Sequence, residues 1–171
     1  MISYKNLRKE LLKLKEKDQK LARRNIWDKK TENFNKMAIK RMKEIVKRYG
    51  WPTISMVGKD GAEAAWLLVQ HADRDVKFQK NCLELMRKAS RKGEAELKYL
   101  AYLTDRVRVN SKKLQLYGTQ FYHNKKGRFT FRPIENRKHL EKRRRKMGLG
   151  SFSKYMKGMK KYHEKCTLCF K

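Results

Sequence analysis

Apolar residues recur at helical spacing through the first half of the chain. Four leucines within residues 4–24 lie on one stripe, which predicts an amphipathic helix with a basic outer face. These leucines are Leu7, Leu11, Leu14 and Leu21. A second stripe runs from Phe34 to Tyr49, and Gly50 after it predicts the end of that helix.

The middle of the chain has shorter patterns. Residues 55–61 are interpreted as a linker, and residues 62–71 are apolar almost all round, which predicts a buried helix. Asp75 is expected to cap a helix over residues 76–91, because its side chain can accept from a free amide of the first turn. A further helix is expected over residues 94–109.

The pattern changes at Leu114, where two runs rich in β-formers flank a glycine-containing turn. This predicts a β-hairpin over about residues 114–133, with Gln115, Tyr117, Thr119 and Gln120 on a strand. A basic helix over residues 135–147 and a last short helix over 151–163 are expected to follow. The predicted fold class is therefore mainly α, a single helical domain with one β-hairpin.

Charge divides the chain more sharply than the hydrophobic pattern does. The 171 residues include 47 Lys or Arg and 17 Asp or Glu, for a formal net charge of +30. Residues 1–49 hold 17 basic and 6 acidic side chains, residues 50–121 hold 13 and 8, and residues 122–171 hold 17 and 3. We expect basic N-terminal helices over 1–49, a motif-bearing core with the hairpin over 50–134, and basic C-terminal helices and a tail over 135–171, all within one compact domain.

Several classes of protein are disfavoured by composition. No apolar run approaches the ~20 residues of a membrane-spanning helix, and residues 1–5 do not resemble the start of a signal peptide. The three cysteines do not suggest a disulfide framework. We therefore expect a cytoplasmic protein, with peripheral binding to anionic membranes through residues 4–24 left open.

Polar residues of the centre suggest acid–base chemistry. His71 is the expected proton acceptor or donor, with Asp73 or Asp105 orienting it. If this site is catalytic, hydrolysis or group transfer is expected, with no cofactor, because the chain lacks a glycine-rich phosphate loop and a dinucleotide fingerprint. The expected substrate contacts are Arg106, Gln115, Tyr117, Thr119 and Gln120. The alternative is that the carboxylates cap a helix and His71 satisfies loop carbonyls.

Four motifs occur in order along the chain: Gly50-Trp51-Pro52, Ala65-Trp66-Leu67-Leu68-Val69-Gln70-His71-Ala72-Asp73, Leu100-Ala101-Tyr102-Leu103-Thr104-Asp105-Arg106-Val107 and Gln115-Leu116-Tyr117-Gly118-Thr119-Gln120. Together they resemble the signature of an uncharacterised, largely bacterial domain family, from about residue 5 to 155. No activity is established for that family. The resemblance implies that the polar residues within these motifs define the family, and such residues more often build a site than a core.

A second group of residues is basic and lies on the hairpin and the following helix. These side chains would contact the phosphate backbone of a nucleic acid. They are Lys125, Lys126, Arg128, Arg132, Arg137, Lys138, Lys142, Arg143, Arg144, Arg145 and Lys146. Phe121, Tyr122, Phe129 and Phe131 alternate with the hairpin charges, and we expect the phenylalanine rings to pack in the core.

A third group is His163, Cys166 and Cys169, which offers three of the four ligands that structural zinc requires, with His139 as a distant fourth. No metal site is therefore predicted, and Cys82 is expected to be buried packing. The sequence favours a basic protein that associates with nucleic acid or another polyanion and carries a His/Asp-centred hydrolase or transferase site. The alternative is a non-enzymatic nucleic-acid-binding or packaging protein on a fold that has lost an ancestral activity.

Overall fold

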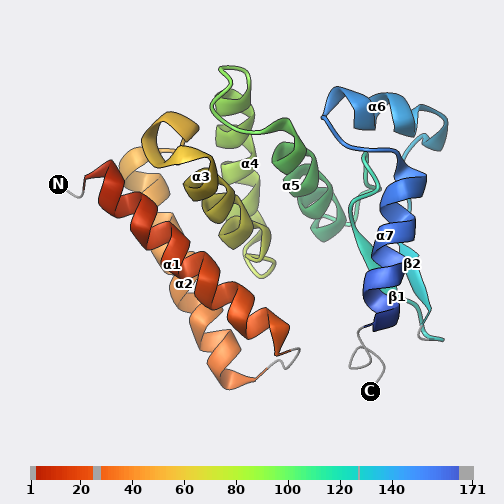
Figure 1. Ribbon diagram of the computed structural model, residues 1–171, viewed down its shortest axis with the longest axis horizontal. Coiled ribbons are helices and arrows are strands. Elements are labelled where there is room, and N and C mark those ends of the chain that lie inside the picture. The colour runs from red at the N-terminus through yellow and green to blue at the C-terminus, as the bar shows by residue number, and fades with distance from the viewer. Residues whose placement is uncertain (1–2, 25–27, 127, 166–171) are drawn as a thin grey trace. The chain divides into compact units, whose positions relative to one another are not determined.

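The computed structural model describes residues 3–24, 28–126 and 128–165 (Figure 1). The chain forms two compact units, Met1–Tyr99 and Leu100–Lys171, and each is described by itself. The division falls inside the segment 50–134 that the sequence marks as the motif-bearing core.

The first unit begins with two long helices, α1 (Tyr4–Arg23) and α2 (Lys29–Tyr49). The α1 stripe is confirmed, with Leu7 and Leu11 fully buried. Asp28 caps α2 by accepting a hydrogen bond from the Thr31 amide at 2.8 Å. Gly50 ends α2 with φ of 72°, a left-handed conformation that glycine adopts without strain.

Helix α3 (Ile54–Gln70) corrects the expected linker over residues 55–61. The Ser55 amide donates to a carboxylate oxygen of Glu94 at 2.8 Å, which stabilises a helical turn before Gly58. Gly58, with φ of 71° and ψ of 168°, then kinks the helix. The turn was missed because it is too short for an apolar stripe to show.

Helix α4 (Val76–Ser90) begins as predicted at Asp75, which accepts from the Phe78 amide at 2.9 Å. Cys82 is fully buried on the inner face of α4, and burial raises the pKa of its thiol to about 12. Its expected packing role is confirmed. Helix α5 (Leu97–Asn110) begins three residues later than position 94, because Glu94 instead binds the start of α3.

The second unit contains a two-stranded antiparallel hairpin of β1 (Phe121–His123) and β2 (Phe129–Phe131), with Phe121 opposite Phe131. The hairpin is confirmed, but its strands are shorter than residues 114–133. The placement of Gln115, Tyr117, Thr119 and Gln120 on a strand is therefore wrong. Residues 114–120 form a loop, in which Gln115 alone makes an isolated bridge, to Ile134.

A 3-10 turn η1 (Arg137–His139) and helix α6 (Leu140–Lys146) follow the hairpin, and α7 (Phe152–Lys165) is the last helix among the described residues. The basic helix is thus shorter than residues 135–147. The Phe131 ring meets the Phe152 ring edge to face, with centroids 5.0 Å apart. The hairpin phenylalanines are half-buried rather than fully enclosed.

The fold is mainly α with one β-hairpin, as the sequence predicts. Within the described ranges, none of the helices combines the length and the apolarity needed to cross a bilayer.

Candidate functional site

Asp105 on α5 is fully buried, and its carboxylate organises the loop of residues 114–120. Its Oδ1 atom accepts from the Leu116 amide at 2.7 Å and the Tyr117 amide at 3.1 Å. Its Oδ2 atom accepts from the amide and the hydroxyl of Thr119, each at 3.0 Å. Burial raises the pKa of Asp105, and the hydrogen bonds from the loop oppose that rise. The carboxylate thus binds the backbone amides of Leu116, Tyr117 and Thr119, which in a β-sheet would be bound by a neighbouring strand.

Two glutamines close the same loop. Gln115 accepts from the Gln120 amide at 2.8 Å and donates to the carbonyl oxygens of Gln120 at 2.9 Å and Arg132 at 2.6 Å. The side chain of Gln120 donates to Thr119 Oγ1 at 3.1 Å and accepts from Arg106 Nη1 at 3.0 Å. Three of the expected substrate contacts, Gln115, Thr119 and Gln120, are therefore bonded to one another.

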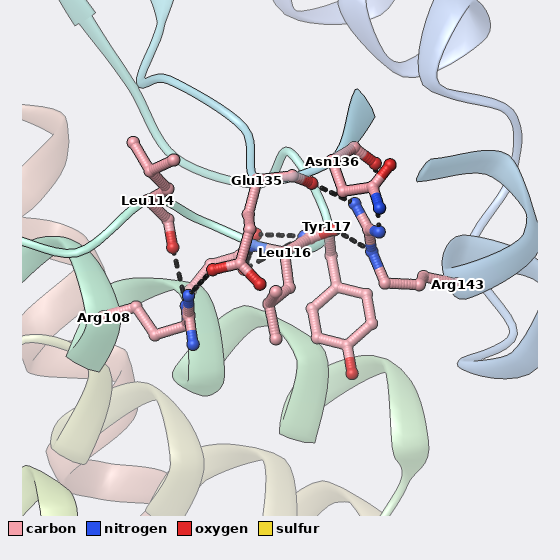
Figure 2. Close-up of polar contacts among 8 residues, drawn as sticks. Arg108, Leu114, Leu116, Tyr117, Glu135, Asn136 and Arg143 are labelled. Carbon is pink, nitrogen blue, oxygen red and sulfur yellow. Dashed lines mark hydrogen bonds and ion pairs between the residues drawn. The ribbon is translucent and has the colours of Figure 1, made fainter. Parts of the chain in front are cut away.

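Arg143 on α6 also binds the loop of residues 114–120, and its guanidinium points at backbone carbonyl oxygens (Figure 2). Its Nε donates to the Leu116 carbonyl oxygen at 2.7 Å. Its two terminal nitrogens donate to the carbonyl oxygens of Glu135 at 2.6 Å and Asn136 at 3.1 Å. Figure 2 also shows Arg108 bonded to the Leu114 carbonyl and paired with Glu135.

Arg144 is more deeply enclosed, with only 2% of its surface exposed. It donates to the Tyr117 carbonyl at 2.6 Å and to the Gly150 carbonyl at 2.8 Å. Arg143 and Arg144, which the sequence places among the phosphate contacts, thus donate to carbonyl oxygens of the second unit, and their contact with a nucleic-acid backbone stays a prediction. The run of basic residues in the sequence does not indicate which of these side chains are buried, as Arg144 is, and which are exposed, as Arg145 is.

His71 has a different partner from those expected. Its Nδ1 lies 2.9 Å from Oδ1 of Asp18, a residue of α1 that is only 5% exposed. The other Asp18 oxygen accepts from the Gln19 side chain at 3.0 Å. Asp73 instead accepts from Gln79 Nε2, at 3.3 Å. His71, Asp18 and Asp73 belong to the first unit and Asp105 to the second.

Asp18 was missed by the sequence analysis, although a signal was present. It continues the helical spacing of Leu7, Leu11, Leu14 and Leu21, and so places a carboxylate on an otherwise apolar stripe. A buried acid at such a position needs a partner, and His71 is that partner.

The remaining basic residues of the hairpin, η1 and α6 are exposed. We call these nine residues the basic segment: Lys125, Lys126, Arg128, Arg132, Arg137, Lys138, Lys142, Arg145 and Lys146. None of them forms an ion pair with another described residue. Arg132 lies over the Tyr122 ring, 4.4 Å from its centroid.

For metal binding, the part of the chain that the structure describes contains no group of three or more His, Cys, Asp or Glu placed to hold an ion. Cys166, Cys169 and the side chain of His163 lie outside the described residues.

The protein is mainly helical, and the motif residue Asp105 on α5 binds the motif residues of the loop 114–120. The chain matches the model of a family of unknown function, DUF6624, over residues 5–165, and it belongs to that family. Neither the curated proteins nor the solved structures contain a significant match to it.

Proposed function

We propose that this protein binds nucleic acid, or another polyanion of similar charge density, through the basic segment. The observation that carries the proposal is the set of nine exposed cations without acidic partners among the described residues. Such a surface repels itself, and a phosphate backbone relieves that repulsion while releasing counterions. We place this activity in the cytoplasm.

Some cations of the first unit are neutralised by ion pairs, whereas others, such as Lys80, Lys88 and Lys92, are exposed without an acidic partner among the described residues. Arg8 pairs with Asp60 at 2.7 Å, and Lys43 pairs with Asp75 at 2.5 Å. In the basic segment the two acidic neighbours are already engaged, since Glu135 pairs with Arg108 and Glu141 accepts from the Phe152 amide. The basic segment thus gathers nine unpaired cations within residues 125–146, and this local excess of charge favours it as the contact surface.

Binding of a fluorescent single-stranded RNA, followed by anisotropy, tests the proposal. Lys138, Lys142 and Lys146 are spaced four apart, so changing all three to Gln removes charge from neighbouring helical turns. We expect affinity at physiological salt to fall about tenfold or more. The matched control changes Lys80, Lys88 and Lys92 to Gln, which removes the same charge from another exposed region. Equal losses in both variants would contradict a localised surface.

A second candidate function is acid–base catalysis at His71. Asp18 holds Nδ1, and Nε2 makes no hydrogen bond to the described residues. A buried carboxylate that fixes one ring nitrogen leaves the other available to a substrate proton. RNA is the first substrate to test, because its 2′-hydroxyl is an internal nucleophile. After losing its proton to Nε2 of His71, the 2′-oxygen attacks the adjacent phosphorus and displaces the 5′-oxygen of the next nucleotide, which takes up a proton and leaves a 2′,3′-cyclic phosphate.

Cleavage of RNA under metal-free conditions tests this candidate. His71→Gln is expected to slow cleavage by roughly 10²-fold or more while RNA binding is retained. His139→Gln, at an exposed histidine, is the matched control and should leave the rate unchanged. Absence of cleavage by the wild-type protein, or equal rates in the two variants, would reject catalysis of this reaction at His71.

A further inference from the structure

The second unit contains a cavity of about 280 Å³ between α5, the residues after α6, and α7. Its apolar wall includes Tyr102, Leu149 and Met159, and its polar groups include Arg144 and Lys154. This volume lies just below the range for ligand pockets, about 300–1,000 Å³. An apolar wall with a few cationic groups suits a small anion that carries a ring.

Arg144 is the central feature of this cavity because its charge is buried without an ion pair to the described residues. Nε and one terminal nitrogen donate to carbonyl oxygens, and the other terminal nitrogen has no partner among them. Burial lowers the pKa of Arg144, and the more distant carboxylates of Glu141 and Asp105 only oppose that effect. An anion in the cavity would supply both the missing charge and the missing acceptor.

Gly158 is a second, independent feature of the same cavity. It lies inside α7, where glycine weakens a helix relative to alanine. A Cβ atom built on Gly158 would meet nothing within 4 Å, so packing does not require glycine there. The missing side chain keeps this wall of the cavity open.

From these observations we infer that the cavity is a binding site for a phosphate monoester attached to a flat ring, such as a nucleoside monophosphate. The phosphate would bind the free terminal nitrogen of Arg144 and the ammonium of Lys154, since both groups line the cavity. The ring would pack against Tyr102 and the apolar wall. None of the residues that line the cavity belongs to the basic segment. A phosphate monoester on a flat ring occurs both in a free nucleotide and at the phosphorylated end of a nucleic-acid strand.

Calorimetric titration of the full chain with adenosine monophosphate tests the inference. Gly158→Leu adds a side chain to the cavity wall at a position where its Cβ atom meets nothing within 4 Å, and leucine favours the helix. We expect this variant to keep the wild-type melting temperature and to lose at least about tenfold in affinity. Ser153→Leu adds the same side chain at an exposed position of α7 outside the cavity, and should bind as the wild type does.

Two further arms identify the ligand chemistry. Lys154→Gln should weaken adenosine monophosphate about tenfold, the effect of one charged hydrogen bond, and should leave adenosine binding unchanged. A 5′-phosphorylated oligonucleotide that loses affinity in Gly158→Leu would identify the strand end as the source, whereas unchanged affinity would identify the free nucleotide.

Failure of adenosine monophosphate to saturate the wild-type protein, or equal binding by Gly158→Leu and Ser153→Leu, would overturn the inference. Neither result would affect RNA binding by the basic segment, which is measured with the lysine variants of that segment.

Discussion

Asp105 accepts two hydrogen bonds from Thr119, one from its backbone amide and one from its hydroxyl, each 3.0 Å long. These residues lie in two separate sequence motifs, one on α5 and one in the loop that follows it. The polar residues that make the motifs recognisable thus hold the loop to the helix. Asp105 and Thr119 therefore have a structural role. The exposed cations of the second unit lie in the basic segment instead.

Replacing Asp105 tests this role. Asp105→Asn turns one acceptor oxygen into a donor that faces backbone N–H groups, so we expect the free energy of unfolding to fall by about 2–4 kcal/mol. Chemical denaturation measures this change, and faster hydrogen exchange at the amides of Leu116, Tyr117 and Thr119 localises it. Unchanged stability and exchange would show that the carboxylate does not hold the loop.

Gly118 is expected to tolerate no side chain. Its φ is 68°, and a Cβ atom there would lie 2.7 Å from the Phe152 ring. Gly148 has a similar φ of 65° but nothing within 4 Å of its Cβ position. Gly148→Ala should therefore cost only the conformational strain, about 1 kcal/mol, and Gly118→Ala should cost clearly more. Equal melting temperatures for the two variants would contradict the packing of Phe152 on this loop.

Arg143 and Lys142 are adjacent in sequence but are expected to differ in role. Arg143→Gln removes donors from the carbonyl oxygens of Leu116, Glu135 and Asn136, and should lower stability by about 1–3 kcal/mol. Lys142→Gln should leave stability unchanged and weaken RNA binding. Thermal denaturation and anisotropy on both variants measure these effects, and a stable Arg143→Gln variant that binds RNA poorly would return Arg143 to the contact surface.

Asp28 is expected to contribute to acid sensitivity of the first unit. Hydrogen bonds from the Thr31 amide and hydroxyl, with help from Arg24, lower the pKa of Asp28 to about 2. A carboxyl with a lowered folded pKa stabilises above its unfolded pKa, about 4, and loses that effect as pH falls through the folded value. Asp28→Asn keeps a capping side chain, so the wild-type advantage in melting temperature should shrink between about pH 4 and pH 2. An advantage that does not change with pH would contradict this assignment.

The helices were predictable because their signals are local. The stripe that begins at Leu7 and the cap at Asp75 each act over a few residues. The loop of residues 114–120 was not predictable as a loop, since its β-forming residues bind side chains distant in sequence, such as Asp105 and Arg143. His71 was recognised as a candidate, but its partner Asp18 lies more than fifty positions earlier and reaches it only through the packing of α1 on α3.

The central claim is that the unpaired charge of the basic segment binds a phosphate backbone, and the salt dependence of RNA affinity tests it most directly. Each neutralised phosphate of a single strand contributes about −0.7 to the slope of log K against log salt concentration. The wild-type protein should therefore give a slope of about −3 or steeper, and the variant with Lys138, Lys142 and Lys146 changed to Gln should be shallower by about 2. Binding that is independent of salt, or no binding at low salt, would contradict the account.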